Sequence, residues 1–108
     1  FELDTGWATY AGHDPLVVLR DLGERVRMIH VKDFVEGAVP KEGKCGAHTM
    51  PRFTTPGTGK LNLRGVLQAA KEMNLPYAIV EQDFQYHLTE LETLTGAYLN
   101  IKETGFLD

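Results

Sequence analysis

Three short apolar runs in the sequence each end on a side chain of a kind that binds metals. They are residues 1–4, which end on Asp4, residues 26–30, which end on His30, and residues 77–81, which end on Glu81. If the runs are parallel strands of one barrel, their carboxyl ends lie on one rim, where distant residues can converge on an ion or a substrate. Two carboxylates and an imidazole suit a divalent cation.

Signals for amphipathic helices follow the first two runs. Asp14 and Pro15 supply an N-cap and a proline at the first helical position, so a helix should begin there and stop at Gly23. Asn62 can cap a second helix that ends near Pro76. The inner face of this second helix is predicted to consist of Leu63, Val66, Leu67, Ala70 and Met73.

A third helix is predicted after the last run. Thr89 and Glu92 have the spacing of a capping box. They introduce an apolar stripe that continues almost to the end of the chain and consists of Leu91, Leu94, Tyr98 and Ile101.

These elements define a topology of three βα units. Residues 34–58 are crowded with Gly and Pro and show no sustained period, so they are predicted to form a long loop, which in a compact domain is usually functional or disordered. Helical crossovers between strands imply a parallel sheet. A complete (β/α)8 barrel takes ~30 residues per unit, so the chain would supply about three of eight. We therefore predict an α/β fold, a partial TIM barrel, in a single domain over residues 1–108.

Composition limits the partners and the compartment. Hydrophobic and charged fractions of 43% and 24% are ordinary for a globular domain, and no apolar run approaches the ~20 residues of a membrane helix. The net charge of -4 and the scattered Lys and Arg residues argue against nucleic-acid binding and favour a small-molecule partner. Cys45 is the only cysteine, so no internal disulfide forms, which fits a reducing compartment such as the cytoplasm. Because the chain opens at Phe1 with a strand already under way, we expect a fragment of a larger barrel.

Alternation along the strands predicts which side chains share a face. If His30 points into the barrel, Lys32 does too, while Val31 faces the helices. The same alternation places Glu2 with Asp4 and Asp83 with Glu81. Acidic residues and Lys also end strands simply by reaching solvent, and His30 could be a hydrogen-bonded core histidine. Spacing alone therefore leaves the metal site open.

Four motifs, taken in order, resemble a known family. They are residues 2–8 with 11–15 (ELDTGWA and AGHDP), residues 29–33 (IHVKD), residues 57–59 (GTG) and residues 80–83 (VEQD). Together they are similar to the C-terminal part of the sugar phosphate isomerase/epimerase family, the xylose-isomerase-like TIM barrels. The resemblance covers nearly the whole chain and implies the C-terminal three βα units of such a barrel.

The resemblance implies a metal centre. In tagatose-epimerase-like members one divalent ion is held by Glu, Asp, His and Glu from four successive strands, and the last three fall on Asp4, His30 and Glu81. The first Glu would lie upstream of Phe1. The ion would be Mn, Zn, Mg or Co. Those members also carry a His three residues after the metal Asp, where this sequence has Trp7; a branch with an Asp-x-x-Trp pattern shares this departure, which leaves the substrate open.

The resemblance also implies an activity. A metal-dependent sugar or sugar phosphate isomerase or epimerase would transfer a proton through a metal-stabilised enediolate. Glu81 would be the general base, and Lys32 would either place a cation beside the developing charge or pair structurally with Asp33 or Glu2. The alternatives are a keto-polyol dehydratase on the same barrel, a phosphodiesterase of the related AP-endonuclease branch, and a non-catalytic carbohydrate-binding or structural fragment.

Several further residues have both a functional and a structural interpretation. Trp7 could form an apolar wall for a sugar ring or only pack, and Arg52 could clamp an anionic substrate or be a solvated loop residue. Residues 57–59 could bind phosphate through backbone N–H groups, although a turn is expected. Cys45 and His48 have a Cys-x-x-His spacing without a second ligand pair. Unpaired edge strands of a partial barrel should lead to self-association.

Overall fold

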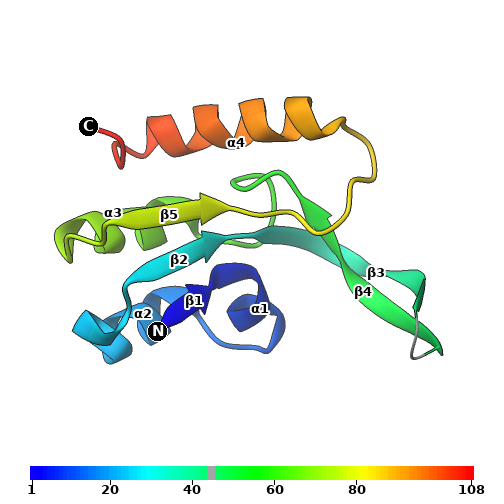
Figure 1. Ribbon diagram of the computed structural model, residues 1–108, viewed down its shortest axis with the longest axis horizontal. Coiled ribbons are helices and arrows are strands. Elements are labelled where there is room, and N and C mark those ends of the chain that lie inside the picture. The colour runs from blue at the N-terminus through cyan, green and yellow to red at the C-terminus, as the bar shows by residue number, and fades with distance from the viewer. Residues whose placement is uncertain (44–45) are drawn as a thin grey trace.

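The computed structural model describes residues 1–43 and 46–108, with residues 38–43 and 46–48 described by their backbone alone. Three parallel strands form one sheet in the order β1 (Glu2–Asp4), β2 (Met28–Val31) and β5 (Tyr77–Val80) (Figure 1). In the register, Asp4 is the partner of His30 and Val31 is the partner of Val80. The strands therefore end level with one another, as strands on one barrel rim do.

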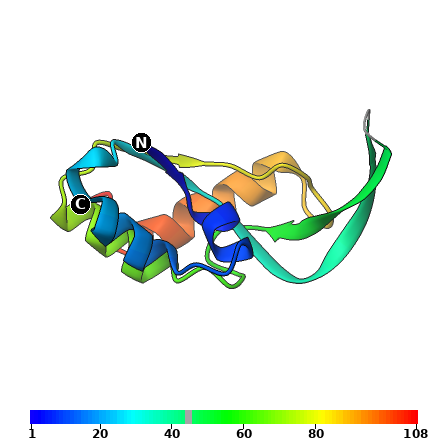
Figure 2. The same cartoon turned by 90° about the horizontal axis from the view of Figure 1, so that it is seen from below.

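Helices connect and cover these strands. They are α1 (Thr5–Tyr10), α2 (Pro15–Leu22) with a following 3-10 turn (Gly23–Arg25), α3 (Leu63–Glu72) and α4 (Glu90–Glu103). Figure 2 shows α2 and α3 side by side on one face of the sheet. None of the described helices has the length and apolar run that crossing a lipid bilayer would require.

The three predicted helix starts are confirmed, and each has the expected cap. The Asp14 carboxylate accepts from the N–H of Leu16 at 2.9 Å, and α2 ends at Leu22 with Gly23 as its C-cap. The Asn62 side chain accepts from the N–H of Gly65 at 3.0 Å. The capping box at the start of α4 is complete on both sides. These side chains satisfy N–H groups that the first turn of a helix leaves without partners, so the sequence signal is local.

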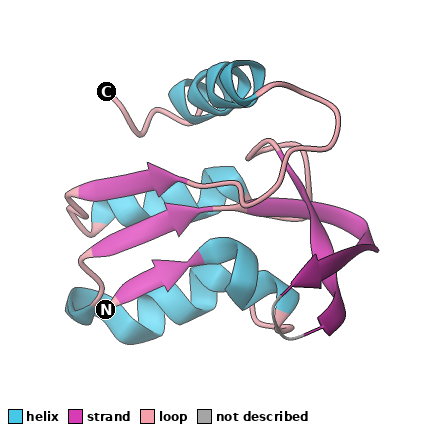
Figure 3. Cartoon of the chain, turned by 45° about the vertical axis from the view of Figure 1, so that its right-hand side comes forward, coloured by secondary structure: helices cyan, strands magenta, loops and turns pink. Residues whose placement is uncertain are grey.

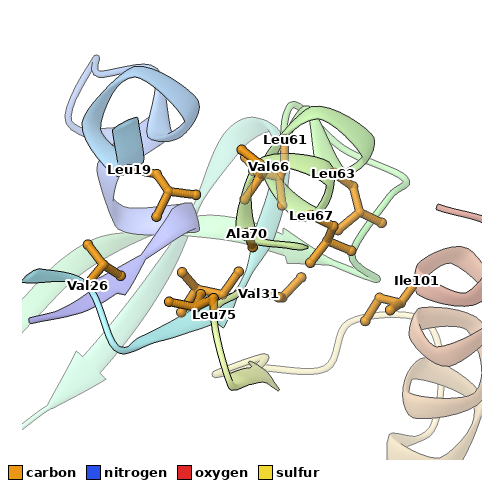
Figure 4. Packing of buried hydrophobic residues seen from close by; sticks show 12 residues of the cluster. Leu19, Val26, Val31, Leu61, Leu63, Val66, Leu67, Ala70, Leu75 and Ile101 are labelled. Atoms are coloured by element: carbon orange, nitrogen blue, oxygen red, sulfur yellow. The ribbon is translucent and has the colours of Figure 1, made fainter. Parts of the chain in front are cut away.

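The core lies between the sheet and the α2–α3 layer, as Figure 4 shows. Ile29 and Val31 point from β2 into this layer and are fully buried, while the alternate residues Met28 and His30 are only partly covered. Full burial of one such aliphatic side chain contributes ~1.5–3 kcal/mol. The buried cluster also contains Leu19, Val26, Leu61, Leu63, Val66, Leu67, Ala69, Ala70, Leu75 and Ile101. The predicted division of β2 into a core face and a site face is confirmed.

The predicted long loop over residues 34–58 is wrong for most of its length. Two antiparallel strands, β3 (Asp33–Gly43) and β4 (Gly46–Thr54), form a ribbon that turns away from the parallel sheet (Figure 3). Gly37, with φ 105°, lies at an irregularity in the register between Val35 and Ala38. A two-stranded ribbon consists of edge strands only, and edge strands tolerate proline, which is why Pro40 and Pro51 do not prevent pairing.

The predicted apolar stripe of α4 faces solvent, except at Ile101. The buried residues of this helix are Thr93, Ala97 and Ile101. Leu91 is 74% exposed, and Leu94 and Tyr98 are exposed as well. The periodicity of the sequence identified a helix with an apolar face, but α4 contacts the rest of the described chain through a different face.

Candidate metal centre

Asp4, His30 and Glu81 converge at the carboxyl ends of the parallel strands. Asp4 is the last residue of β1, His30 lies in β2, and Glu81 directly follows β5. One potential ligand atom from each residue lies within 4.8 Å of the others. Atoms that share one ion at bond lengths of about 2.0–2.6 Å are at most about 5 Å apart, so this spacing fits joint coordination. The two carboxylates and the imidazole form a donor set suited to a divalent ion.

The two ring nitrogens of His30 face different carboxylates. Nδ1 lies 2.9 Å from Oε2 of Glu81 and 3.8 Å from Oδ2 of Asp4. Nε2 contacts Oε1 of Glu2. A metal-binding histidine commonly donates its second N–H to a carboxylate, which fixes the orientation of the ring. The arrangement therefore directs Nδ1 toward the other two candidate ligands and gives Glu2 an orienting position.

Lys32 lies at the centre of the acidic residues. Its side chain is only 3% exposed, and Nζ lies 3.1 Å from Oδ2 of Asp4, 2.9 Å from Oε2 of Glu81 and 3.1 Å from Oδ2 of Asp83. Burial lowers the pKa of Lys32, but hydrogen bonds to the three carboxylates outweigh this effect, so the net pKa is raised above 10.5. The predicted pairing of Lys32 with Asp33 or Glu2 is therefore wrong, because the ammonium pairs with Asp4, Glu81 and Asp83. With its pKa raised, Lys32 is fully charged at neutral pH.

Glu81 remains a carboxylate under the same influence. Its pKa is lowered from 4.5, mainly by the hydrogen bond from Lys32, with partial burial opposing the shift and the charges of Lys32 and His30 adding to it. The group is thus ionised over the neutral range. In this form it can coordinate a cation or accept a proton.

Aromatic side chains pack close to the Lys32 ammonium. The Trp7 ring packs edge-on against Phe53 of β4 and against Tyr10, with both centroid distances 5.7 Å. Nζ of Lys32 lies 5.5 Å from the Trp7 centroid and 5.6 Å from the Phe53 centroid. Ring faces carry partial negative charge and attract a desolvated cation. These rings bring an apolar surface next to the candidate ligands, which agrees with the packing interpretation of Trp7 and leaves its ligand-facing role a prediction.

Asp33 points away from the site and anchors the turn at residues 57–59. Its Oδ1 accepts from the N–H groups of Phe34 and Leu61 at 2.9 Å, and Oδ2 accepts from Gly57 at 3.0 Å and Gly59 at 2.9 Å. A Cβ at Gly59 would overlap the Phe34 carbonyl oxygen and the Asp33 carboxylate, so only glycine fits. The expected turn is confirmed, and the N–H groups of Gly57 and Gly59 bind the Asp33 carboxylate rather than a phosphate.

The remaining predicted residues lie elsewhere. Arg52 is on β4 opposite Val35, and its guanidinium contacts the ring of His87. Its proposed role as an anion clamp stays a prediction. Cys45 lies outside the described residues and His48 is described by its backbone alone, so the Cys-x-x-His spacing also stays a prediction.

Three further residues, Glu2, Phe53 and Asp83, lie at the site, and the sequence assigns none of them to metal or substrate. Alternation along the strands placed Glu2 and Asp83 on the correct face, and that signal was sufficient to find them. Phe53 had no such signal, because its position depends on a ribbon that the sequence did not predict.

Comparison with known proteins finds relatives in sequence and, separately, solved structures of the same fold. No family model matches the chain. An inosose dehydratase from Clostridium tetani is 36% identical over 76 residues, which cover 66% of this chain and 26% of that protein. An inosose dehydratase from Lacticaseibacillus casei is 28% identical over 116 residues and is matched over 94% of this chain and 39% of its own length.

Two solved structures with the same fold are sugar phosphate isomerase/epimerases. One from Parabacteroides distasonis superimposes with a TM-score of 0.64 at 23% identity and covers 93% of this chain and 29% of its own. A second from the same organism gives a TM-score of 0.72 at 15% identity, with coverage of 100% and 32%. The predicted resemblance to this xylose-isomerase-like class is therefore confirmed in the fold. The sequence is similar to inosose dehydratases, and the chain spans only 26% to 39% of the length of these relatives.

Proposed function

We propose that this chain supplies the metal-binding rim of a barrel enzyme that removes a proton beside the carbonyl of a sugar or keto-polyol. The observation that carries the proposal is the convergence of Asp4, His30 and Glu81 within 4.8 Å. These three residues would hold the ion, and the fourth ligand would come from a Glu in a segment of the polypeptide upstream of Phe1. The donor set suits Mn, Zn, Mg or Co.

The residues of the chain have separate tasks in this proposal. When bound, a divalent cation supplies positive charge for the oxygens of an enediolate. Glu81 acts as the general base, because its carboxylate is ionised at neutral pH and stands on the rim. Lys32 adds a fixed positive charge beside Glu81 from an almost fully buried position.

Two products are compatible with this first step. If a carboxylate returns the proton to the substrate, the enzyme is a sugar or sugar phosphate isomerase or epimerase. If a neighbouring hydroxyl leaves as water instead, the enzyme is a keto-polyol dehydratase. The similarity to inosose dehydratases favours the second outcome, whereas the shared fold of the isomerase/epimerases fits both.

The substrate is proposed to be a neutral or anionic polyol. Trp7 would present an apolar surface to the C–H groups of a sugar or cyclitol ring, beside the polar rim. Arg52 would serve an anionic group, if the substrate carries one. The proposed partner is thus a small molecule rather than a nucleic acid or a membrane.

Incubation of the full-length protein with an inosose and with ketose sugars in deuterated water tests the proposal. An isomerase or epimerase gives a rearranged product that has lost no atoms except a hydrogen replaced by deuterium. A dehydratase gives a product that has lost one molecule of water. Full activity after exhaustive chelation of divalent ions, or no exchange with any keto-polyol, would contradict the proposed function.

A further inference from the structure

Lys32 and the proposed ion would use the same carboxylates. Nζ of Lys32 lies 3.1 Å from Oδ2 of Asp4 and 2.9 Å from Oε2 of Glu81. Two cations close to the same oxygens repel each other. With its side chain 3% exposed, Lys32 is almost fully enclosed by the protein. Binding of an ion therefore requires another residue to hold the ammonium in place.

Asp83 has the required position. Both of its oxygens lie within hydrogen-bonding distance of Nζ, at 3.1 Å and 3.3 Å. Asp83 lies outside the group of described residues whose ligand atoms lie within 4.8 Å of one another. The Asp83 carboxylate thus pairs with Lys32 and not with the proposed ion, whereas Lys32 and the proposed ion would share the carboxylates of Asp4 and Glu81.

Two aromatic rings also lie against the Lys32 ammonium. The Trp7 and Phe53 centroids lie 5.5 Å and 5.6 Å from Nζ. Together with Asp83 they form an environment that stabilises an ammonium without the two shared carboxylates.

We propose that Asp83 is a positioning residue, which retains Lys32 beside the metal ligands and so leaves Asp4 and Glu81 available to the ion. This inference rests on the proposed function, since it presumes that an ion binds to these two residues. Without Asp83, the ammonium depends on the oxygens of Asp4 and Glu81 and competes with the ion for them. Asp83 therefore acts on the metal through Lys32 and not as a ligand.

Binding of Mn²⁺ alone to the metal-free, full-length protein tests this role, with free Mn²⁺ measured by electron paramagnetic resonance. Asp83→Asn should weaken Mn²⁺ binding by about tenfold, the usual scale for loss of an outer-shell partner. In a Lys32→Met background the same substitution should change binding by less than about twofold, because the competing ammonium is absent. Asp83→Glu should restore most of the affinity, since it restores the carboxylate.

Controls separate this role from bulk charge and from misfolding. Asp21→Asn removes the same charge at an exposed position of α2 and should leave Mn²⁺ binding unchanged. If Asp83→Asn fails to fold, Mn²⁺ binding is measured for Asp83→Ser in the wild-type and Lys32→Met backgrounds.

The outcomes distinguish this inference from the proposed function. Equal losses in both backgrounds would show that Asp83 acts by its own charge, and no loss in either would show that it is not needed; each result overturns the inference and leaves the proposed function standing. A wild-type protein that binds none of Mn²⁺, Zn²⁺, Mg²⁺ and Co²⁺ overturns both.

Discussion

The Lys32 ammonium lies 2.9 Å from the Glu81 carboxylate, and each residue directly follows one member of the Val31–Val80 pair of the parallel register. Strands that end level deliver their next residues to the same rim. Glu81 also lies 2.9 Å from Nδ1 of His30, so one carboxylate faces both a fixed ammonium and a candidate metal ligand.

Glu81→Gln should abolish turnover in the full-length enzyme while the fold persists, because an amide cannot accept the proton and is a poor ligand. The expected loss is at least ~10²–10⁴-fold, the contribution of a positioned general base. Steady-state assays measure the effect, with the substrate that the experiment in deuterated water identifies. Circular dichroism checks that the variant is folded. Glu24→Gln, at an exposed position beyond the other end of the strands, is the matched control. Near-normal turnover of Glu81→Gln would place the base elsewhere.

The stability of the metal-free protein should depend on the ionisation of Glu81. The folded state lowers the pKa of Glu81 below 4.5, so its contribution to folding is fully present above that pH and is lost as the pH falls through the lower folded-state value. Chemical denaturation of the wild type and Glu81→Gln should show a difference in the free energy of unfolding at neutral pH that shrinks in acid. A difference that stays constant below pH 4.5 would disprove this assignment.

Asp33→Asn should destabilise the fold by ~2–4 kcal/mol, because the amide nitrogen cannot accept the two N–H groups that one carboxylate oxygen binds. The midpoint of urea unfolding measures the effect. Asp14→Asn is the matched control: asparagine caps a helix about as well as aspartate, so its effect should stay within ~0.5 kcal/mol. Equal stability of the two variants would mean that the four hydrogen bonds of Asp33 contribute little.

The isolated 108-residue chain should not behave as a simple monomer. β1 and β5 are the two edges of the parallel sheet, Ile79 of β5 is 44% exposed, and the apolar side of α4 faces solvent at Leu91 and Leu94. Unpaired edges and apolar surface promote association. Sedimentation velocity at micromolar concentration should show oligomers that diminish in Leu91→Gln/Leu94→Gln, but not in Val17→Gln on α2. A stable monomer of 12.1 kDa would contradict the partial-barrel interpretation.

The parts of the fold that could be predicted are those coded by short-range signals. Caps at Asp14, Asn62 and Thr89 fix helix starts through contacts within a few residues, and alternation fixes the two faces of β2. The ribbon of β3 and β4 could not be predicted, because its strands are stabilised by pairing with each other and contain Gly and Pro. The orientation of α4 depends on packing, which periodicity does not specify.

The candidate site also contains residues that could be predicted from the sequence and contacts that could not. Asp4, His30 and Glu81 could be found from strand ends, since topology alone brings them together. The partners of Lys32 could not, because a lysine side chain reaches several carboxylates and only the packing around it selects among them.

The alternation at the end of β2 joins chemistry and folding in adjacent residues. Lys32 serves the rim, and Asp33, pointing the other way, holds the turn at residues 57–59. Loss of one residue within Met28–Val31 would turn both side chains to the opposite face, so that the ammonium would enter the apolar core side of the sheet and the Asp33 carboxylate would face the site. Natural length variation should therefore be excluded from this strand and tolerated in the β3–β4 ribbon, where an added pair of residues changes only its reach.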